Sequence, residues 1–490
     1  MAQTRTSIRF LLNDRQVDLD TVAASDTLLD FLRLQQRMCG SKEGCAEGDC
    51  GACTVLVGRL AQGKLVYETV NSCIRFVGSL DACHVVTIEH LRGSEGALHP
   101  VQQAMVEMHG SQCGFCTPGI VMSLYALWMA NANPSNAEIE TSLQGNLCRC
   151  TGYDAIVKAA MAATRAGGQS QDVLIRERDR VMATLEGLAD GARVEMGHGD
   201  DRFFVPASVD DLADLRSQHP TSVIVAGATD VGLWVTKFMR PIAPAIFIPH
   251  LDELHRIEET ASGLIIGACV TYTEFQASVA RHFPQIAHYW NRIGGEQVRN
   301  MGTVGGNVAN GSPIGDTPPV LIALGASVTL RQGGERRTVP VEKFFIDYGK
   351  QDRLPGDFVE ALHVPFVGAD DTFAAYKVSK RRDEDISSVA AAFRLKISDG
   401  KVAEAVIAYG GMAATPKRAS TVETLLTGKP WSLQSITEAQ AGFDDDFSPI
   451  GDWRASAEYR ALVARKLLAR LFLETTQGRD ATMLKREAAV

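Results

Sequence analysis

Hydrophobic and polar positions alternate in short runs along the first ninety residues, which is typical of strands. The strand-like runs cover residues 7–20, with a turn inside, then 53–70 and 83–91. One helical pattern covers residues 27–36. This order predicts a small α+β domain over residues 1–89.

The pattern becomes helical between residues 90 and 165. Apolar positions recur at helical spacing in 99–110, 119–130, 136–145 and 154–163. Thr117 before Pro118, and Thr151 ahead of Asp154, have the residue types that cap helix starts. We therefore expect a four-helix domain over residues 90–165.

The remaining chain divides into three further segments. Residues 166–197 are charged and helical without a clear apolar face, which predicts a connector. A new domain is expected over 198–378, because an apolar strand there runs into a glycine-rich loop. Residues 379–490 alternate strand patterns with later helices and predict a small α+β domain.

Charge and hydropathy exclude several classes of partner. The 490 residues carry a net charge of −9 without a long basic run, so we expect no nucleic-acid or anionic-membrane partner. The most apolar window, 119–130, is shorter than the ~20 residues that cross a bilayer. With no visible targeting segment, the expectation is a cytoplasmic protein.

The cysteines concentrate in the first third of the chain. Of 11 cysteines, ten lie between residues 39 and 150, and in a reducing compartment such clusters favour metal or redox chemistry. Cys45, Cys50 and Cys53, with Cys73 further on, have the spacing of plant-type 2Fe–2S ferredoxins. A four-cysteine zinc site is the alternative, but zinc sites usually pair two C-x2-C knuckles.

Glycines in the same loop support the iron–sulfur interpretation. We expect Gly44, Gly48 and Gly51 to adopt positive φ and to bring backbone amides towards the cluster sulfurs.

A second group consists of Cys113, Cys116, Cys148 and Cys150, each pair just ahead of a predicted helix. The positive end of a helix stabilises a thiolate cluster. The spacing alone would also fit zinc. Cys39 and Cys83 lie off both patterns and are predicted to be small buried hydrophobic residues.

Two glycine-rich segments, 221–233 and 298–326, stand out in the third domain. Neither has the G-x-G-x-x-G fingerprint, yet loops of small residues can cradle a pyrophosphate with consecutive amides. Taken alone, such loops are more often tight turns. Thr229, Thr303 and Asn307 would add neutral donors, and Asp316 could accept from ribose or ribityl hydroxyls.

Four motifs carry a resemblance to a known family: "GCAEGDCGAC", "NSC", "QCGFCTPG" and "CRCTGY". Through them, residues 1–165 resemble the twin 2Fe–2S module of the xanthine dehydrogenase and aldehyde oxidase family of molybdenum hydroxylases. The resemblance implies a multidomain α+β protein. Its parts would be a β-grasp 2Fe–2S ferredoxin domain, a four-helix 2Fe–2S domain, a vanillyl-alcohol-oxidase-type FAD domain and a C-terminal α+β flavoprotein domain.

The same resemblance implies the cofactor ligands. The eight cysteines of the two groups would hold two 2Fe–2S clusters. FAD would be bound by Ile224, Val225, Ala226, Gly227, Ala228, Thr229, Asp230, Val231, Ile293, Thr303, Gly305, Gly306, Asn307, Asp316, Val359 and Lys377. Relatives often carry Asn and Ser where this chain has Ala228 and Thr303.

In the family that this chain resembles, the electrons come from a molybdopterin centre, which implies a partner for this chain. A large molybdopterin-binding subunit is expected, in a heterotetramer of two small and two large chains. Gln112 would contact the pterin, or would only bond its own loop backbone. Near the flavin, Tyr348 and the charged loop 380–385 with Asp385 would receive NAD, although such a charge run can also be a solvated face.

The function expected from the resemblance is electron transfer from molybdopterin through two clusters to FAD and on to NAD, during hydroxylation of hypoxanthine or xanthine to urate. Dioxygen is the alternative acceptor. An aldehyde, nicotinate or another heteroaromatic compound is the alternative substrate. A zinc-stapled binding protein is the alternative from a different class.

Overall fold

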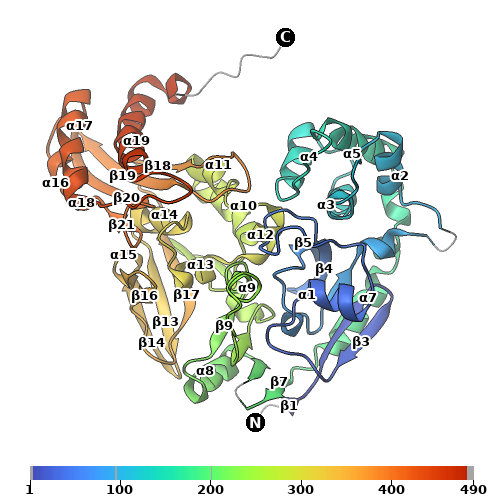
Figure 1. Cartoon of the computed structure of the whole chain (residues 1–490). Helices are drawn as coiled ribbons and strands as arrows, with labels where there is room; N and C mark the ends of the chain where they lie inside the picture. The colour runs from blue at the N-terminus through green and yellow to red at the C-terminus, as the bar shows by residue number, and fades with distance from the viewer. Residues whose placement is uncertain (1–3, 94–95, 200, 483–490) are drawn as a thin grey trace.

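The computed structural model describes residues 4–93, 96–199 and 201–482 (Figure 1). In Figure 1 the blue amino-terminal strands and the teal helices lie on one side of the molecule. The yellow and orange strands lie on the other side, with β9 and α9 between them. The multidomain α+β architecture confirms the predicted fold class.

The first region is a five-stranded sheet covered by one short helix. Its order is β3-β2-β6-β4-β5, with β2 and β6 parallel and the other pairs antiparallel. Helix α1 (Leu28–Asp30) continues as a π-helical turn over Phe31–Gln35, and Thr27 caps it by accepting from the Asp30 amide. This is a β-grasp arrangement. The strands are β2 (Ile8–Leu12), β3 (Arg15–Leu19), β4 (Thr54–Ala61), β5 (Lys64–Asn71) and β6 (His84–Val86).

The second region is helical, with α3 in its core. Ile120, Tyr125 and Trp128 of α3 are fully buried. Thr117 and Thr151 do not cap the helices as predicted: Cys116 precedes α3, and Tyr153, in the left-handed conformation, precedes α5. The helices are α2 (Pro100–Glu107), α3 (Thr117–Ala130), α4 (Asn136–Ser142) and α5 (Asp154–Ala166).

The connector contains α6 (Val173–Arg176) and α7 (Arg178–Leu188). Contrary to expectation, α7 has a core face: Val181, Leu185 and Leu188 are buried against Leu11 and Leu65 of the β-grasp sheet. Three apolar residues at this spacing form a stripe too narrow to stand out among the charges around it.

The third region has two five-stranded sheets. The first has the order β1-β7-β8-β10-β9, and β1 (Thr4–Arg5) pairs parallel with β7, so the start of the chain enters this sheet. The second has the order β11-β12-β17-β13-β14. The strands are β7 (Arg193–His198), β8 (Asp201–Val205), β9 (Val223–Val225), β10 (Ala245–Phe247), β11 (Ile257–Glu259), β12 (Gly263–Gly267), β13 (Ser327–Gln332), β14 (Glu335–Pro340) and β17 (Phe358–Pro365).

Short helices and a small hairpin complete the third region. The helices are α8 (Val209–Gln218), α9 (Val231–Thr236), α10 (Tyr272–His282), α11 (Ala287–Trp290), α12 (Glu296–Met301), α13 (Val304–Asn310), α14 (Thr317–Leu324) and α15 (Val341–Phe344). The hairpin pairs β15 (Phe345–Asp347) with β16 (Lys350–Gln351).

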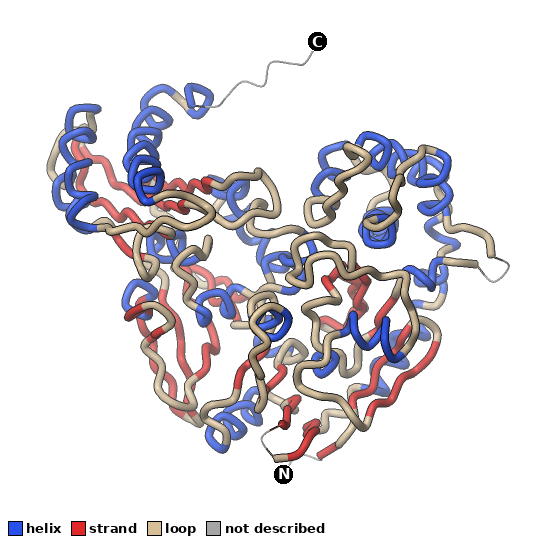
Figure 2. Tube along the Cα trace, viewed as in Figure 1, coloured by secondary structure: helices blue, strands red, loops and turns tan. Residues whose placement is uncertain are grey.

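The carboxy-terminal region is a four-stranded antiparallel sheet beside helices (Figure 2). Its edge strand β18 (Asp371–Val378), which the sequence assigns to the preceding domain, pairs with β19 (Val389–Ser398). The other elements are β20 (Lys401–Gly410), β21 (Lys417–Arg418), α16 (Ser420–Leu426), α17 (Leu433–Ala439), α18 (Phe443–Asp446) and α19 (Ala457–Gln477).

Within the described ranges, we find no helix with the length and hydropathy needed to span a bilayer.

Candidate functional site

The thiols of Cys45, Cys50, Cys53 and Cys73 meet in the β-grasp region. The Cys45 thiol interacts with those of Cys50 and Cys73, and the Cys53 thiol interacts with that of Cys73. Two backbone amides, of Cys50 at 3.3 Å and Glu47 at 3.4 Å, donate to Cys45 Sγ. The Cys50 and Cys73 thiols and these amides hold the pKa of Cys45 well below its usual range, which favours a thiolate there.

Glycines allow the loop to close around these sulfurs. Gly48 and Gly51 have the predicted positive φ, at 77° and 68°. Gly44 does not, so that part of the prediction is wrong. A Cβ at Gly44 would lie 2.8 Å from Cys50 Sγ, so glycine is needed there for close approach.

The second group of cysteines meets as two pairs. Cys150 Sγ lies 3.4 Å from Cys113 Sγ, and the Cys116 thiol interacts with that of Cys148. Burial raises the pKa of Cys116 to about 12. Burial also opposes ionisation of Cys148, but hydrogen bonds from Thr151 leave the pKa of Cys148 below its ordinary value. The Cys148 thiol is therefore the more acidic of this pair.

The donor sets fit iron–sulfur clusters. A 2Fe–2S cluster takes four cysteine thiolates, and each group offers four. In the described ranges no three His, Cys, Asp or Glu side chains converge on a single metal ion. A 2Fe–2S cluster does not need this, because each of its irons takes only two cysteine thiolates, and the second group lies as two such pairs. Of the cysteines off the pattern, Cys83 is buried as expected, but Cys39 is exposed, so its predicted burial is wrong: it lies in the turn after the π-helical segment.

The two glycine-rich segments touch each other. Ile224 and Val225 end β9, residues 226–230 form a loop, and Val231 begins α9. A Cβ at Gly227 would lie 1.8 Å from the Met301 carbonyl oxygen, so only glycine allows the segments to approach this closely. Ala228 has a positive φ of 60°. Asp230 Oδ2 accepts a hydrogen bond from Trp234 Nε1 at 3.1 Å.

The second segment begins α13. Thr303 Oγ1 caps this helix by accepting from the Gly306 amide at 3.0 Å, while Gly305 packs against Ala268. Asn307 Oδ1 is buried without a hydrogen-bond partner. An unsatisfied buried oxygen is destabilising, which makes Asn307 a candidate ligand contact.

Asp316 and Lys377 form an ion pair, with Lys377 Nζ 2.5 Å from Asp316 Oδ2. Ser387 Oγ donates to Asp316 Oδ1 at 2.5 Å, and both charged side chains are buried. Ser387 is not among the residues predicted from the sequence. It lies 71 residues after Asp316, just past the charged loop, and its sequence context does not distinguish it from other serines. Ile293 and Val359 belong to the hydrophobic core of the third region.

Of the residues predicted on the acceptor and pterin sides, Tyr348 and Gln112 are exposed, whereas Asp385 is half-buried. Tyr348 is 75% exposed in the β15–β16 turn, and Gln112 is exposed beside Cys113. Asp385 Oδ2 accepts from the Arg381 amide at 2.7 Å.

The charged loop 380–385 packs against two other regions. Arg381 Nη2 lies 3.1 Å from Asp49 Oδ1 in the first cysteine loop, and Gln144 Nε2 donates to Asp383 Oδ1 at 3.0 Å. Glu384 is buried, with Oε2 unpartnered, and burial raises its pKa to about 8. The sequence gives no sign of these contacts.

The first cysteine group packs directly against α9. Thr236 Oγ1 donates to the Ala46 carbonyl at 2.6 Å, and a Cβ at Gly232 would lie 2.6 Å from Ile74 Cβ. The helix that follows the first glycine-rich loop therefore contacts residues adjacent to Cys45 and Cys73.

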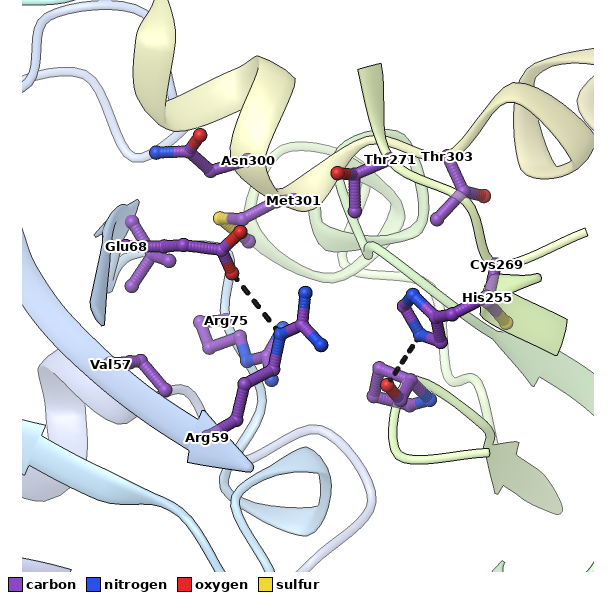
Figure 3. A pocket seen from close by; sticks show the side chains of 12 residues that line it. Val57, Arg59, Glu68, Arg75, His255, Cys269, Thr271, Asn300, Met301 and Thr303 are labelled. Atoms are coloured by element: carbon purple, nitrogen blue, oxygen red, sulfur yellow. Dashed lines mark hydrogen bonds and ion pairs between the residues drawn. The ribbon is translucent and has the colours of Figure 1, made fainter. Parts of the chain in front are cut away.

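A second contact between these regions encloses a cavity of about 30 Å³. Figure 3 shows Arg59 and Glu68 of the β-grasp sheet facing His255 and Thr303 of the third region. Arg59 binds both Glu68 at 3.2 Å and Glu274 at 2.7 Å. The Arg59–Glu274 ion pair joins the β-grasp sheet to α10.

Three family models match the chain. The "FAD binding domain in molybdopterin dehydrogenase" matches residues 196–367, the "CO dehydrogenase flavoprotein C-terminal domain" matches 374–475, and the "[2Fe-2S] binding domain" matches 87–161.

Curated relatives are similar over most of the chain. Xanthine dehydrogenase of Drosophila subobscura is 32% identical over 90% of this chain and 37% of its own length. Xanthine dehydrogenase/oxidase of Rattus norvegicus is 29% identical over 97% of this chain and 39% of its own length. The chain thus spans less than half the length of these relatives.

Solved structures match about half of the chain. CO dehydrogenase from Oligotropha carboxidovorans is 26% identical, with a TM-score of 0.51, over 56% of this chain and 96% of that chain. Quinoline 2-oxidoreductase from Pseudomonas putida 86, at 23% identity and a TM-score of 0.51 over the same shares, shows the fold alone. With all three domain models matched in order, the chain belongs to the molybdenum hydroxylase family and carries its iron–sulfur, FAD-binding and C-terminal flavoprotein domains.

Proposed function

We propose that this chain is the electron-transfer subunit of a xanthine dehydrogenase. Electrons would enter from a molybdopterin centre on a large partner subunit and leave to NAD⁺ while xanthine or hypoxanthine is hydroxylated to urate. The similarity to xanthine dehydrogenases over at least 90% of this chain supports this assignment.

The eight cysteines would hold two 2Fe–2S clusters. Each iron of such a cluster takes two cysteine thiolates, which agrees with the pairing of Cys113 with Cys150 and of Cys116 with Cys148. The Glu47 and Cys50 amides would stabilise negative charge on the first cluster, as they do on Cys45 Sγ.

FAD would lie along the two glycine-rich segments. Amides of residues 227–230 would bind its pyrophosphate, and Asn307 would supply a side-chain contact. The Lys377–Asp316 pair would orient the Asp316 carboxylate towards a hydroxyl of the cofactor, with Ser387 holding its other oxygen.

One observation carries the order of transfer: Thr236 on α9 is hydrogen-bonded to Ala46, next to Cys45. Because α9 follows the proposed pyrophosphate loop, the first cysteine group is adjacent to the proposed flavin site. When bound, the clusters carry single electrons, and the flavin can exchange either one electron or a hydride with nicotinamide.

The same proposal assigns the residues that would contact the pterin and NAD⁺. Gln112, exposed beside Cys113, would contact the pterin. Tyr348 and Asp385 would lie on the NAD⁺ side. We propose a cytoplasmic heterotetramer of two small and two large chains. A related hydroxylase for an aldehyde, nicotinate or another heteroaromatic compound is the alternative, since the partner would select the substrate.

The test is to purify the tagged chain from its native host and to identify its partners. We expect a molybdenum-containing chain in stoichiometric amount, and urate formation from xanthine with NAD⁺ as acceptor. Activity with quinoline, nicotinate or aldehydes but not with xanthine would replace the substrate assignment. Absence of any molybdenum-containing partner would contradict the proposal as a whole.

A further inference from the structure

We propose that Gln297, on α12 of the FAD-binding region, is a positioning residue that sets the separation of the two cysteine groups. The inference rests on the proposed function, in which both groups hold iron–sulfur clusters. Gln297 belongs to neither cluster-binding region, and its sequence context, "GEQVRNMG", contains no signal for this role.

A backbone hydrogen bond joins the two cysteine loops. The Leu147 amide donates to the Cys50 carbonyl at 3.0 Å, and Leu147 is bonded to Cys148 along the chain. One residue earlier, Asn146 Nδ2 donates to the Gly51 carbonyl at 3.1 Å. A ligand residue of the first group and the neighbour of a ligand in the second are therefore in direct contact.

Gln297 holds Asn146 in place. Its side chain is completely buried, and Nε2 lies 2.9 Å from Asn146 Oδ1. The same nitrogen lies 3.1 Å from both Ser123 Oγ on α3 and Thr54 Oγ1 on β4. One amide from the FAD-binding region thus bonds both cluster-binding regions, beside Cys53 on one side and near Cys148 on the other.

The fit around this amide is tight. A Cβ at Gly145 would lie 1.8 Å from Gln297 Oε1, and a Cβ at Gly295 would lie 2.5 Å from Gly145 Cα. Two glycines from different regions therefore face each other, and the backbones approach as closely as they can. A displaced Gln297 amide would therefore disturb Gly145 and Asn146, because it contacts both.

This arrangement makes the FAD-binding region part of the contact between clusters. The step served is the transfer of one electron, by which one cluster is oxidised and the other reduced; no bond forms or breaks. Such transfer depends steeply on separation. The Leu147–Cys50 contact fixes that separation, and Gln297 fixes the contact.

Gln297→Leu removes the amide while approximately keeping its volume. The matched control is Asn300→Leu on the same helix: Asn300 Nδ2 donates to the Thr69 carbonyl on β5 at 2.9 Å, and the side chain has no hydrogen bond to any of the eight cysteines or to Asn146. Both variants lose buried hydrogen bonds across the same boundary between regions, but only one touches Asn146.

Two readouts are independent of turnover. Amide exchange at Leu147 reports the hydrogen bond to Cys50, and the spin–spin splitting in the electron paramagnetic resonance spectrum of the fully reduced chain reports cluster separation. Gln297→Leu should speed exchange at Leu147 severalfold and should diminish the splitting, with the g values of each cluster retained. Asn300→Leu should change neither.

Unchanged splitting in Gln297→Leu, or an equal loss in Asn300→Leu, would overturn the proposal. If Gln297→Leu does not assemble clusters, Ser123→Ala is the milder variant: a smaller loss of splitting supports the role, and an unchanged spectrum overturns it. A wild-type chain without iron signals would instead contradict the proposed function, before any variant is compared.

Discussion

Lys377 Nζ lies 2.5 Å from Asp316 Oδ2, and this ion pair joins β18 of the carboxy-terminal sheet to the start of α14 in the FAD-binding region. Both side chains are buried, so neither charge has water to replace its partner. The proposed flavin site therefore depends on the packing of the carboxy-terminal region against the FAD-binding region.

Lys377→Met should leave the Asp316 carboxylate buried without a counter-ion. Breaking a buried pair in this way destabilises by about 3–5 kcal/mol, and we expect loss of FAD along with it. Urea unfolding and flavin content measure the two effects. Lys343→Met, at an exposed lysine, is the control. A Lys377→Met protein with wild-type stability and flavin would show that the pair is dispensable.

Asn307→Asp should weaken FAD retention. It places a negative charge beside the proposed pyrophosphate, and we expect an affinity loss of about tenfold, equivalent to about 1.4 kcal/mol. Flavin fluorescence released on dilution gives the affinity. Asn133→Asp makes the same charge change at an exposed position in the helical region. Equal retention in both variants would remove Asn307 from the FAD site.

Comparing Cys73→Ser with Cys83→Ser distinguishes a proposed cluster ligand from a cysteine of the hydrophobic core. Both side chains are buried, at 3% and 6% exposure, so the two substitutions are matched in burial. Cys73→Ser should reduce the iron content to about half, because one of two clusters is lost. Cys83→Ser should keep all of it. Iron loss of the same size in both variants would indicate unfolding rather than ligand loss.

Glu384 should make stability depend on pH. Burial first, and then the Asp49 charge, raise its pKa from 4.5 to about 8, although Arg299, Arg381 and Lys377 act in the opposite direction. Between pH 4.5 and about 8, the folded chain holds a proton on Glu384 that the unfolded chain has lost. The stability that protonated Glu384 contributes is therefore complete below pH 4.5 and is lost as the pH rises through about 8.

Glu384→Gln removes that titration. The free energy of unfolding of the variant minus that of wild type should therefore increase as pH rises from 4.5 to 8. Chemical unfolding at several pH values measures the difference, and other titrating groups cancel in it. A difference that is constant across this range would show that Glu384 ionises normally.

Local patterns predicted the architecture and both groups of cysteines. Three proposed ligands of the first group, Cys45, Cys50 and Cys53, lie within one short loop, so their spacing already indicates that their thiols meet. The glycine-rich loops were recognisable for the same reason, since Gly227 and Gly302 lie in short runs of small residues.

Contacts between regions could not be predicted in this way. Gln297 reaches Thr54 across 243 residues, and Arg381 reaches Asp49 across 332. Neither side chain differs in its sequence context from a solvated polar residue. Cys39 shows the reverse error: its residue type suggested burial, but the turn in which it lies exposes it.

The most direct measurement is the metal and acid-labile sulfide content of the anaerobically purified chain. Two 2Fe–2S clusters on eight cysteines predict about four iron atoms and about four labile sulfides per chain, with visible absorption that dithionite bleaches. A colourless chain with stoichiometric zinc and no labile sulfide would contradict the account.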